Sequence, residues 1–174
     1  MIAFDLIGQT PLVLLESFSD ENVQIYAKLE QFNPGGSVKD RLGKYLVETA
    51  IKEGRVSSGD TIVEATAGNT GIGLVIAANR YHLKCVIFAP EGFSEEKISI
   101  MRALGADIKH TPKDEGMIGA QTKARSYAQE YGAVYMNQFE TEYNPSAYTH
   151  TLGKQLTDTL PNIDYFLSLI HISE

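Results

Sequence analysis

Segments with strand-like and helix-like patterns alternate along most of this chain, and no other feature constrains the fold as strongly. Short apolar runs such as 85–88 (CVIF) are separated by longer segments in which apolar residues recur at helical spacing. Strands that alternate with helices form a parallel sheet covered by helices, since each crossover returns the chain to the same end of the sheet. The sequence therefore predicts an α/β fold with three layers, in which helices cover both faces of a parallel sheet.

The individual elements follow from these patterns and from their end signals. We expect strands over 12–15, 23–29, 61–64, 85–88, 107–109 and 134–136, and helices over 37–53, 70–80, 94–104 and 119–130. Gly54 ends the first helix, and Ser94, followed by two glutamates, is the predicted N-cap of the third. Ligands bind beyond the carboxyl ends of strands in such sheets, so we expect a site in the loops after Leu29, Glu64 and Met136.

Lys39 lies in the segment 33–41 (NPGGSVKDR), directly after a proline–glycine turn and in the first turn of a predicted helix. A helix N-terminus carries partial positive charge, so a cation there is unfavourable by about 0.3–1 kcal/mol. Burial, or covalent storage on a carbonyl cofactor, can turn such a lysine into a nucleophile. An ordinary solvated lysine is the alternative, and this segment alone leaves both open.

The second loop, 64–73 (EATAGNTGIG), brings hydroxyls, an amide and glycines to the start of a predicted helix. Backbone N–H groups at a helix N-terminus bind anions, so the loop predicts a phosphate or carboxylate site. It is no P-loop, because Leu74 and Val75 stand where lysine and a hydroxyl are required. It also lacks the glycine order of the dinucleotide fingerprint. A turn that merely packs a helix closely on the sheet is the simpler alternative.

Composition narrows the classes of function. The net charge of −7, from 22 acidic and 15 basic residues, disfavours binding to nucleic acid or to a membrane surface. The single Cys85 lies in an apolar run, which indicates a buried structural thiol and a reducing, cytoplasmic setting. No secretory signal or membrane-spanning run is recognisable. The histidines His82, His110 and His150 are too scattered to predict a metal site.

Considered together, these segments resemble the cysteine synthase and cystathionine β-synthase family of fold-type II pyridoxal-phosphate enzymes, whose fold is similar to that of the tryptophan synthase β chain. The resemblance covers about the first 166 residues. It rests on the order and spacing of 7–12 (IGQTPL), the Lys39 motif, 68–71 (GNTG), 136–139 (MNQF), Asn144-Pro145 and His150. No one of these motifs would identify the family alone.

The resemblance implies a set of roles. Lys39 is implied to bind pyridoxal 5′-phosphate covalently and to remove the substrate α-proton, and Asn69 to hydrogen-bond the ring oxygen of the cofactor. The substrate carboxylate is implied to be bound by Thr66, Ala67, Gly68, Asn69, Thr70 and Gln138. The implied reaction is β-replacement on O-acetylserine, with sulfide or homocysteine as the nucleophile. Cysteine synthases usually carry serine where this chain has Ala67, and alanine resembles the bacterial branch that makes cystathionine.

The resemblance also divides the chain. We expect residues 1–35 to pack on a C-terminal domain, 36–144 to form the N-terminal α/β domain, and 145–174 to begin the C-terminal domain. Residues 167–174 do not match the family, and the turn that cups the cofactor phosphate is not found. We therefore expect a C-terminally truncated member with an incomplete second domain and an exposed apolar surface at Phe166, Leu167, Leu169 and Ile170. An intact member is expected to be a homodimer. The alternatives are a catalytically inert fragment and a serine/threonine dehydratase on the same fold.

Overall fold

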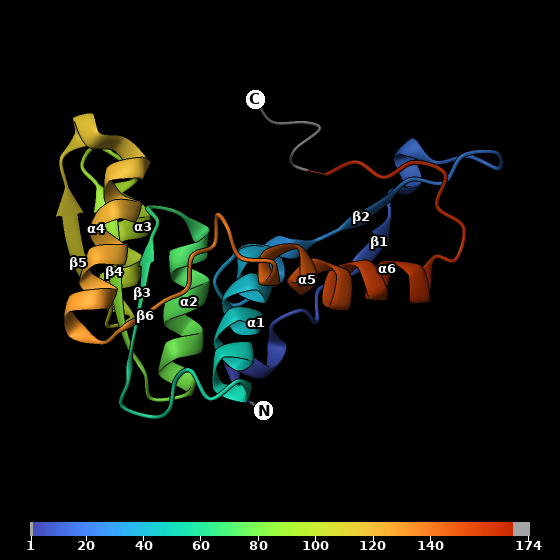
Figure 1. Ribbon diagram of the computed structural model, residues 1–174. Helices are drawn as coiled ribbons and strands as arrows, with labels where there is room; N and C mark the ends of the chain where they lie inside the picture. The colour runs from blue at the N-terminus through green and yellow to red at the C-terminus, as the bar shows by residue number, and fades with distance from the viewer. Residues whose placement is uncertain (1, 169–174) are drawn as a thin grey trace.

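The computed structural model describes residues 2–168 and contains a four-stranded parallel sheet (Figure 1). The strands are β3 (Thr61–Ala65), β4 (Lys84–Pro90), β5 (Asp107–Thr111) and β6 (Val134–Tyr135), in the order β5-β4-β3-β6. Each neighbouring pair is parallel, with Val63 opposite Val86 on one side and Tyr135 on the other. The predicted parallel sheet is confirmed.

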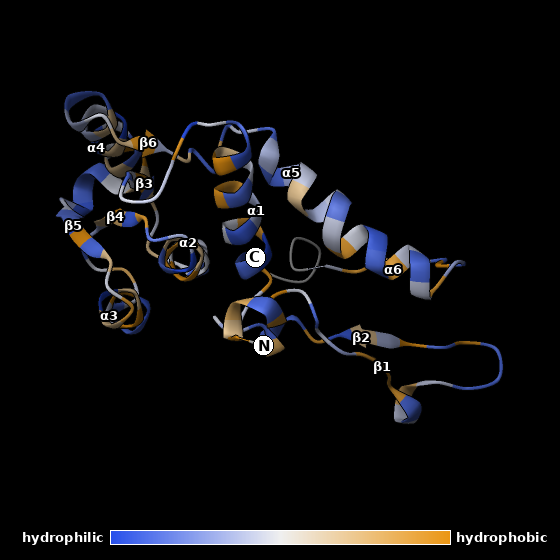
Figure 2. Cartoon of the chain, turned by 90° about the horizontal axis from the view of Figure 1, so that it is seen from below, coloured by the Kyte–Doolittle hydropathy of each residue, from blue (hydrophilic) through white to orange (hydrophobic). Residues whose placement is uncertain are grey.

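Helices cover both faces of this sheet. Figure 2 shows α4 (Gly116–Tyr131) on one side of the strands, and α2 (Asn69–Arg80) and α3 (Glu95–Ala103) on the other. The α4 face buries Val63, Ala65, Val86, Phe88, Ala120 and Ala124. The larger core lies between the opposite face, α2 and α1 (Lys39–Lys52), which packs on α2 rather than on the sheet. The three-layer α/β prediction is therefore confirmed, with α1 as an additional outer helix.

Local signals account for the helix ends. The Ser94 hydroxyl accepts a hydrogen bond from the Lys97 backbone N–H at 3.4 Å, as an N-cap does. Gly54 has φ +70° and follows α1, and Gly132 with φ +64° ends α4 in the left-handed conformation that favours glycine. The predicted helix ends at Ser94 and Gly54 are confirmed within one or two residues.

The second predicted strand, 23–29, is wrong in length and in partner. Only β2 (Tyr26–Lys28) forms, and it pairs antiparallel with β1 (Leu12–Leu14) in a separate two-stranded sheet. Alternation of apolar and polar residues indicates that one face of a strand is buried, but it does not indicate which strand is the neighbour. The loop after Leu29 therefore does not lie at the edge of the parallel sheet. It contains a short 3₁₀ helix, Glu30–Phe32, and leads into α1. Three further 3₁₀ turns occupy Ala3–Leu6, Glu16–Phe18 and Lys113–Glu115.

The chain around and after Pro145 is helical and packs on α1. α5 (Tyr143–Tyr148), a π-helical turn (Thr149–Gly153) and α6 (Lys154–Thr159) follow one another without a break, and α5 packs on α1. Ala147 and Leu156 are buried by this packing. Phe166 and Leu167 are 57% and 72% exposed, as predicted, whereas Leu169 and Ile170 lie outside the described residues.

Candidate active site

The crossing of α1 and α2 brings the first turn of α1 against the first turns of α2. Gly43 and Gly73 face each other where the helices cross, and a Cβ atom added to Gly43 would overlap the Gly73 carbonyl. A Cβ added to Gly73 would lie 2.6 Å from the Lys39 carbonyl oxygen. Two glycines thus permit backbone contact between the helices, and this contact sets the position of Lys39 relative to the loop that begins α2.

We expect Gly43→Ala to lower the free energy of unfolding by about 1–3 kcal/mol, because the added methyl group has no space at the crossing. This range already includes a gain of about 1 kcal/mol, because alanine has a higher helix propensity than glycine. Urea unfolding measures the change. The control is Gly153→Ala, since a Cβ there has a single close neighbour, the Tyr148 carbonyl oxygen at 3.3 Å. Equal stability of the two variants would contradict the proposed role of the crossing.

Lys39 is half-buried at the start of α1. Its ammonium donates a hydrogen bond to the Tyr148 hydroxyl at 2.9 Å and lies 5.2 Å from the centre of that ring. The amine is therefore paired with the hydroxyl of a tyrosine from α5, which explains how a cation is accommodated at a helix N-terminus. No local pattern indicates a role for Tyr148, because it lies 109 residues further along the chain than Lys39.

Asp40 fixes the turn that precedes Lys39. Its fully buried carboxylate accepts a hydrogen bond from the Gly35 backbone N–H, and a Cβ at Gly35 would collide with that carboxylate. Burial raises the pKa of Asp40 to about 6, although the hydrogen bond from Gly35 opposes this. The glycine turn is thus required by close packing as well as by local conformation.

The loop before α2 presents an open helix N-terminus. Gly68 is the N-cap residue of α2 and no side chain caps it, while the Thr66 hydroxyl accepts a hydrogen bond from the Gly68 N–H at 3.2 Å. Thr66, Ala67 and Thr70 are buried, and Gly68 and Asn69 are partly exposed. Uncapped first-turn N–H groups and the helix dipole favour an anion at this position. The anion site at this loop stays a prediction, and the uncapped helix N-terminus is the feature it relies on.

Gln138 lies beside this loop, although 68 residues separate it from Thr70. The Gln138 side-chain amide donates to the Ala65 carbonyl oxygen at 3.1 Å, and the Asn144 amide donates to the Gln138 carbonyl oxygen at 2.9 Å. The structure therefore brings Gln138 and residues 66–70 together at the carboxyl end of β3. The helix crossing places the Lys39 backbone against α2, the helix that this loop begins. The Lys39 amine is bonded to Tyr148 rather than to the loop.

Glu64 is a residue whose importance the sequence analysis missed. It lies on β3 directly before the loop and is fully buried. Its two carboxylate oxygens accept the backbone N–H groups of Ala65 at 2.7 Å and Gln138 at 3.0 Å. Burial raises its pKa from 4.5 to about 7, although both hydrogen bonds oppose the shift. An acidic residue at the end of an apolar strand was the available signal.

The raised pKa of Glu64 predicts a pH dependence of stability. The folded state binds this proton more tightly than the unfolded state, so the contribution is complete below pH 4.5 and is lost as the pH rises through about 7. Glu64 alone then lowers the free energy of unfolding by up to about 1.4 kcal/mol per pH unit in this range. We expect Glu64→Gln to remove this slope in urea unfolding, and Glu140→Gln, at an exposed position, to retain it. The same slope in all three proteins would contradict the assignment.

Cys85 lies on the neighbouring strand and is buried. Burial, with a smaller contribution from the Glu64 charge, raises the pKa of its thiol to about 12. A thiol with such a pKa is a poor nucleophile at neutral pH. The prediction of a buried structural thiol is therefore confirmed.

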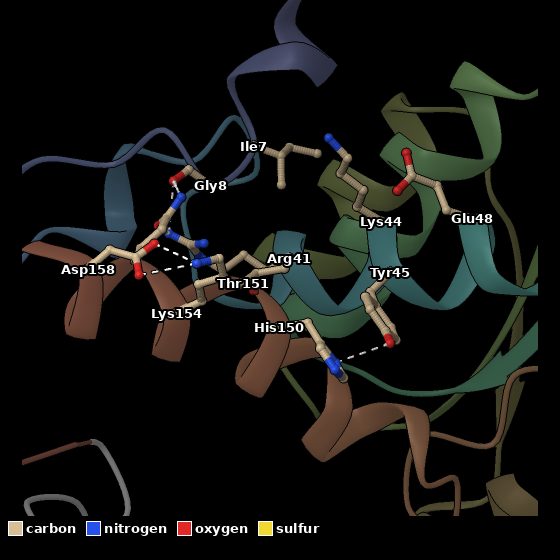
Figure 3. Close-up of a pocket in the computed structure, with 11 residues that line it drawn as sticks. Ile7, Gly8, Arg41, Lys44, Tyr45, Glu48, His150, Thr151, Lys154 and Asp158 are labelled. Atoms are coloured by element: carbon tan, nitrogen blue, oxygen red, sulfur yellow. Dashed lines mark hydrogen bonds and ion pairs between the residues drawn. The ribbon is translucent and has the colours of Figure 1, made fainter.

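A cavity of about 290 Å³ lies on another side of α1, between that helix, the helical segment 150–158 and the segment around Gly8 (Figure 3). His150 stacks on Tyr45 in its wall with ring centres 6.2 Å apart, and Lys154 pairs with Asp158 at 2.8 Å. Its lining includes neither Lys39 nor residues 66–70 nor Gln138. This cavity is therefore separate from the candidate active site.

Within residues 2–168, no group of three or more histidine, cysteine, aspartate or glutamate side chains is arranged to hold a metal ion. In the same part of the chain, no helix has the length and apolar character that crossing a membrane requires.

Comparisons with known proteins agree with this geometry. A family model described as "Pyridoxal-phosphate dependent enzyme" matches residues 3–170. The chain is 50% identical over 167 residues to the O-acetylserine dependent cystathionine beta-synthase of Bacillus subtilis, covering 94% of this chain and 54% of that protein. It is 47% identical over 163 residues to a cysteine synthase of Helicobacter pylori, covering 90% of this chain and 52% of that protein.

Solved structures give the same result. The crystal structure of the O-acetylserine dependent cystathionine beta-synthase from Helicobacter pylori has a TM-score of 0.84 at 46% identity, over 92% of this chain and 55% of that one. O-ureido-L-serine synthase has a TM-score of 0.85 at 36% identity, over 92% and 51%. The chain thus spans about half the length of the curated relatives it matches. The fold-type II prediction is confirmed, and the chain belongs to the pyridoxal-phosphate dependent enzyme family, with cysteine synthases and cystathionine β-synthases among its relatives.

Proposed function

We propose that the intact protein catalyses a pyridoxal-phosphate-dependent β-replacement on O-acetylserine in sulfur amino-acid biosynthesis. The observation that carries this proposal is the position of Lys39, whose backbone packs against the first turns of α2 while the N-terminus of that helix is uncapped. A primary amine and an anion site at one end of the sheet are what an amino-acid substrate and a carbonyl cofactor require.

The residues present fit the cofactor. Lys39 offers a half-buried amine whose hydrogen-bond partner is the Tyr148 hydroxyl. Only this one hydrogen bond must break before the amine can bond the cofactor. Asn69, the first residue of α2, is partly exposed and would offer its amide to the ring oxygen. When bound, pyridoxal phosphate supplies an electron sink that stabilises negative charge at the substrate α-carbon.

Each protein group then has a distinct task. The uncapped N–H groups of α2, with the hydroxyls of Thr66 and Thr70, bind the substrate carboxylate, because the helix dipole favours an anion there. Gln138 contributes from the neighbouring segment. The Lys39 amine accepts the α-proton, since a general base must lie within hydrogen-bond reach of the proton it removes. Departure of acetate and addition of a thiol complete the replacement.

Ala67 favours homocysteine as the nucleophile over sulfide. The Ala67 methyl group is buried in the substrate loop, where a serine would add one hydrogen-bond donor. One hydrogen bond is worth about 1 kcal/mol, which is enough to alter the preferred nucleophile without altering the type of reaction. The Bacillus subtilis relative is named as an O-acetylserine dependent cystathionine beta-synthase, which supports this choice.

Product analysis tests the proposal. A protein carrying the whole fold is incubated with pyridoxal phosphate, O-acetylserine and either homocysteine or sulfide, and cystathionine, cysteine and keto acid are quantified. We expect cystathionine to form faster than cysteine and no keto acid to accumulate. Release of a keto acid from serine or threonine without a thiol would instead identify a dehydratase.

The alternative proposal is that these 174 residues are catalytically inert on their own; they span about half the length of the curated relatives that they match. Addition of pyridoxal phosphate, followed by visible spectroscopy, borohydride reduction and peptide mapping, tests this. A stoichiometric adduct at Lys39 together with turnover would refute it.

We further propose that the intact protein is a cytoplasmic homodimer whose partners are small amino acids and thiols. The buried free thiol of Cys85 and the net charge of −7 support this setting. The assignment of residues 1–35 and 145–174 to a C-terminal domain is part of the same proposal, supported by the separation of the β1–β2 sheet from the parallel sheet.

A further inference from the structure

The pairing of β3 with β6 stops abruptly at the candidate active site. The strands are in parallel register at Ile62 with Val134 and at Val63 with Tyr135, and the Met136 N–H donates to the Val63 carbonyl oxygen at 3.0 Å. If the regular parallel pairing continued, the Ala65 N–H would donate to the Met136 carbonyl oxygen, and the Gln138 N–H would donate to the Ala65 carbonyl oxygen. Neither of these two backbone hydrogen bonds forms.

The Glu64 carboxylate takes both of these N–H groups. One oxygen accepts from Ala65 at 2.7 Å and the other from Gln138 at 3.0 Å. The chain turns away from the sheet at Asn137, whose φ is +54°, a conformation that is uncommon for residues other than glycine. The carboxylate therefore lies at the point where the chain after β6 diverges from β3, which we call the fork. Its two hydrogen bonds replace the next pair of backbone hydrogen bonds between the strands.

The fork separates the two segments that carry the substrate-binding residues. Residues 66–70 continue from β3, and Gln138 continues from β6. The Gln138 side-chain amide also joins the two segments, because it donates to the Ala65 carbonyl oxygen. Both segments are thus bonded at their base to the same fully buried carboxylate.

We propose that Glu64 is a positioning residue that ends the β3–β6 ladder with its carboxylate and holds residues 66–70 and Gln138 at the separation that a substrate carboxylate needs. This inference rests on the proposed function for the identity of the ligand.

A carboxylate suits the fork better than other side chains. It presents two acceptor oxygens and no donor, which matches two N–H groups that face it. Glutamine has one acceptor oxygen, aspartate is one methylene shorter, and an apolar residue would leave two buried N–H groups unpaired. The Glu64 charge acts on two titratable side chains of the neighbouring strands, Cys85 on β4 and Tyr135 on β6. Burial raises the pKa of both, so both are neutral at neutral pH.

Backbone amide hydrogen exchange in Glu64→Gln tests the position of the strand ends without any need for activity. We expect exchange at Ala65 or Gln138 to become at least about tenfold faster, because glutamine cannot accept both bonds, while exchange in α1 stays unchanged. The control is Glu48→Gln, the same replacement at a half-buried glutamate in α1, for which both amides should exchange as in the wild type. Unchanged exchange at both amides in Glu64→Gln would overturn the inference.

A second measurement uses the wild-type protein and stays informative if Glu64→Gln does not fold. The amide proton shifts of Ala65 and Gln138 should titrate together, with the same midpoint as the Glu64 carboxyl carbon. Independent midpoints would show that the carboxylate does not bridge the two groups.

Kinetics then test the link to the substrate. In a protein that carries the whole fold, we expect Glu64→Gln to raise KM for O-acetylserine about tenfold while kcat changes less than about threefold, as for loss of binding common to ground and transition states. Faster exchange with an unchanged KM would refute the positioning role. A wild-type protein that does not turn over O-acetylserine would instead count against the proposed function alone, since the exchange data are independent of it.

Discussion

Replacement of Lys39 by alanine is expected to abolish covalent capture of pyridoxal phosphate and to lower β-replacement turnover by at least about 10³-fold. The estimate combines loss of the nucleophilic amine with loss of a positioned general base, and the base alone is worth about 10²–10⁴-fold. The amine lies at the start of α1, 2.9 Å from the Tyr148 hydroxyl. A methyl group can neither bond the cofactor nor accept a proton.

The measurement uses a protein that carries the whole fold and combines visible spectroscopy with turnover of O-acetylserine. Borohydride reduction and peptide mapping should place the cofactor on Lys39 in the wild type and nowhere on the Lys39→Ala chain. Lys52→Ala, at the exposed end of the same helix, is the control and should behave as the wild type. Turnover at the wild-type rate in Lys39→Ala would exclude the proposed mechanism.

The second large effect is expected at Arg41, which holds the N-terminal segment on α1. Arg41 is 2% exposed, and its guanidinium donates to both carboxylate oxygens of Glu30, at 2.7 and 2.8 Å. It also donates to the Gly8 carbonyl oxygen at 3.0 Å and to Gln155 at 2.9 Å. One side chain therefore joins α1 to the segment before β1, the segment after β2, and α6.

We expect Arg41→Met to lower the free energy of unfolding by about 3–5 kcal/mol, because it leaves the Glu30 carboxylate largely buried without its partner. Burial alone would raise the pKa of Glu30, but hydrogen bonds from Arg41 and Thr10 lower it below its ordinary value of 4.5. The stabilisation by this pair is therefore present above pH 4.5 and is lost as the pH falls through the lower, folded-state pKa.

Urea unfolding at neutral pH measures the effect. The control is Arg55→Met, because the Arg55–Glu53 pair is more than one-third exposed on both sides and should contribute little to stability. The double variant Arg41→Met with Glu30→Leu should recover part of the loss, since the unpaired charge is removed. A change below about 1 kcal/mol in Arg41→Met would show that the network does not hold the N-terminal segment.

Periodicity determined most of the fold because it reports burial. Strands β3 to β5 and the helices between them could be predicted within a few residues, since each presents an apolar face at its own spacing. The β1–β2 hairpin was misread for the same reason. A pattern of burial does not state which strand is the neighbour, and here the neighbour is the preceding strand, in antiparallel orientation.

The loops of the candidate site could also be recognised, because Lys39 and residues 66–70 each lie in a short contiguous segment whose residue types indicate their chemistry. Tyr148 and Glu64 could not be assigned this way. Tyr148 bonds Lys39 across 109 residues, and Glu64 bonds Gln138 across 74, so each contact exists only when the chain is folded.

The sequence by itself determined the alternating α/β order, the lysine in the first turn of α1 and the glycine- and hydroxyl-rich loop before α2, since residues near in sequence and short-range periodicity specify them. The tertiary structure alone decided which groups meet. Two glycines allow α1 and α2 to touch and so set the place of Lys39. The Glu64 carboxylate ends the β3–β6 ladder and fixes Gln138 beside the loop. The physical reason is that close packing and buried hydrogen bonds join residues through space, and no pattern along the chain records these partners.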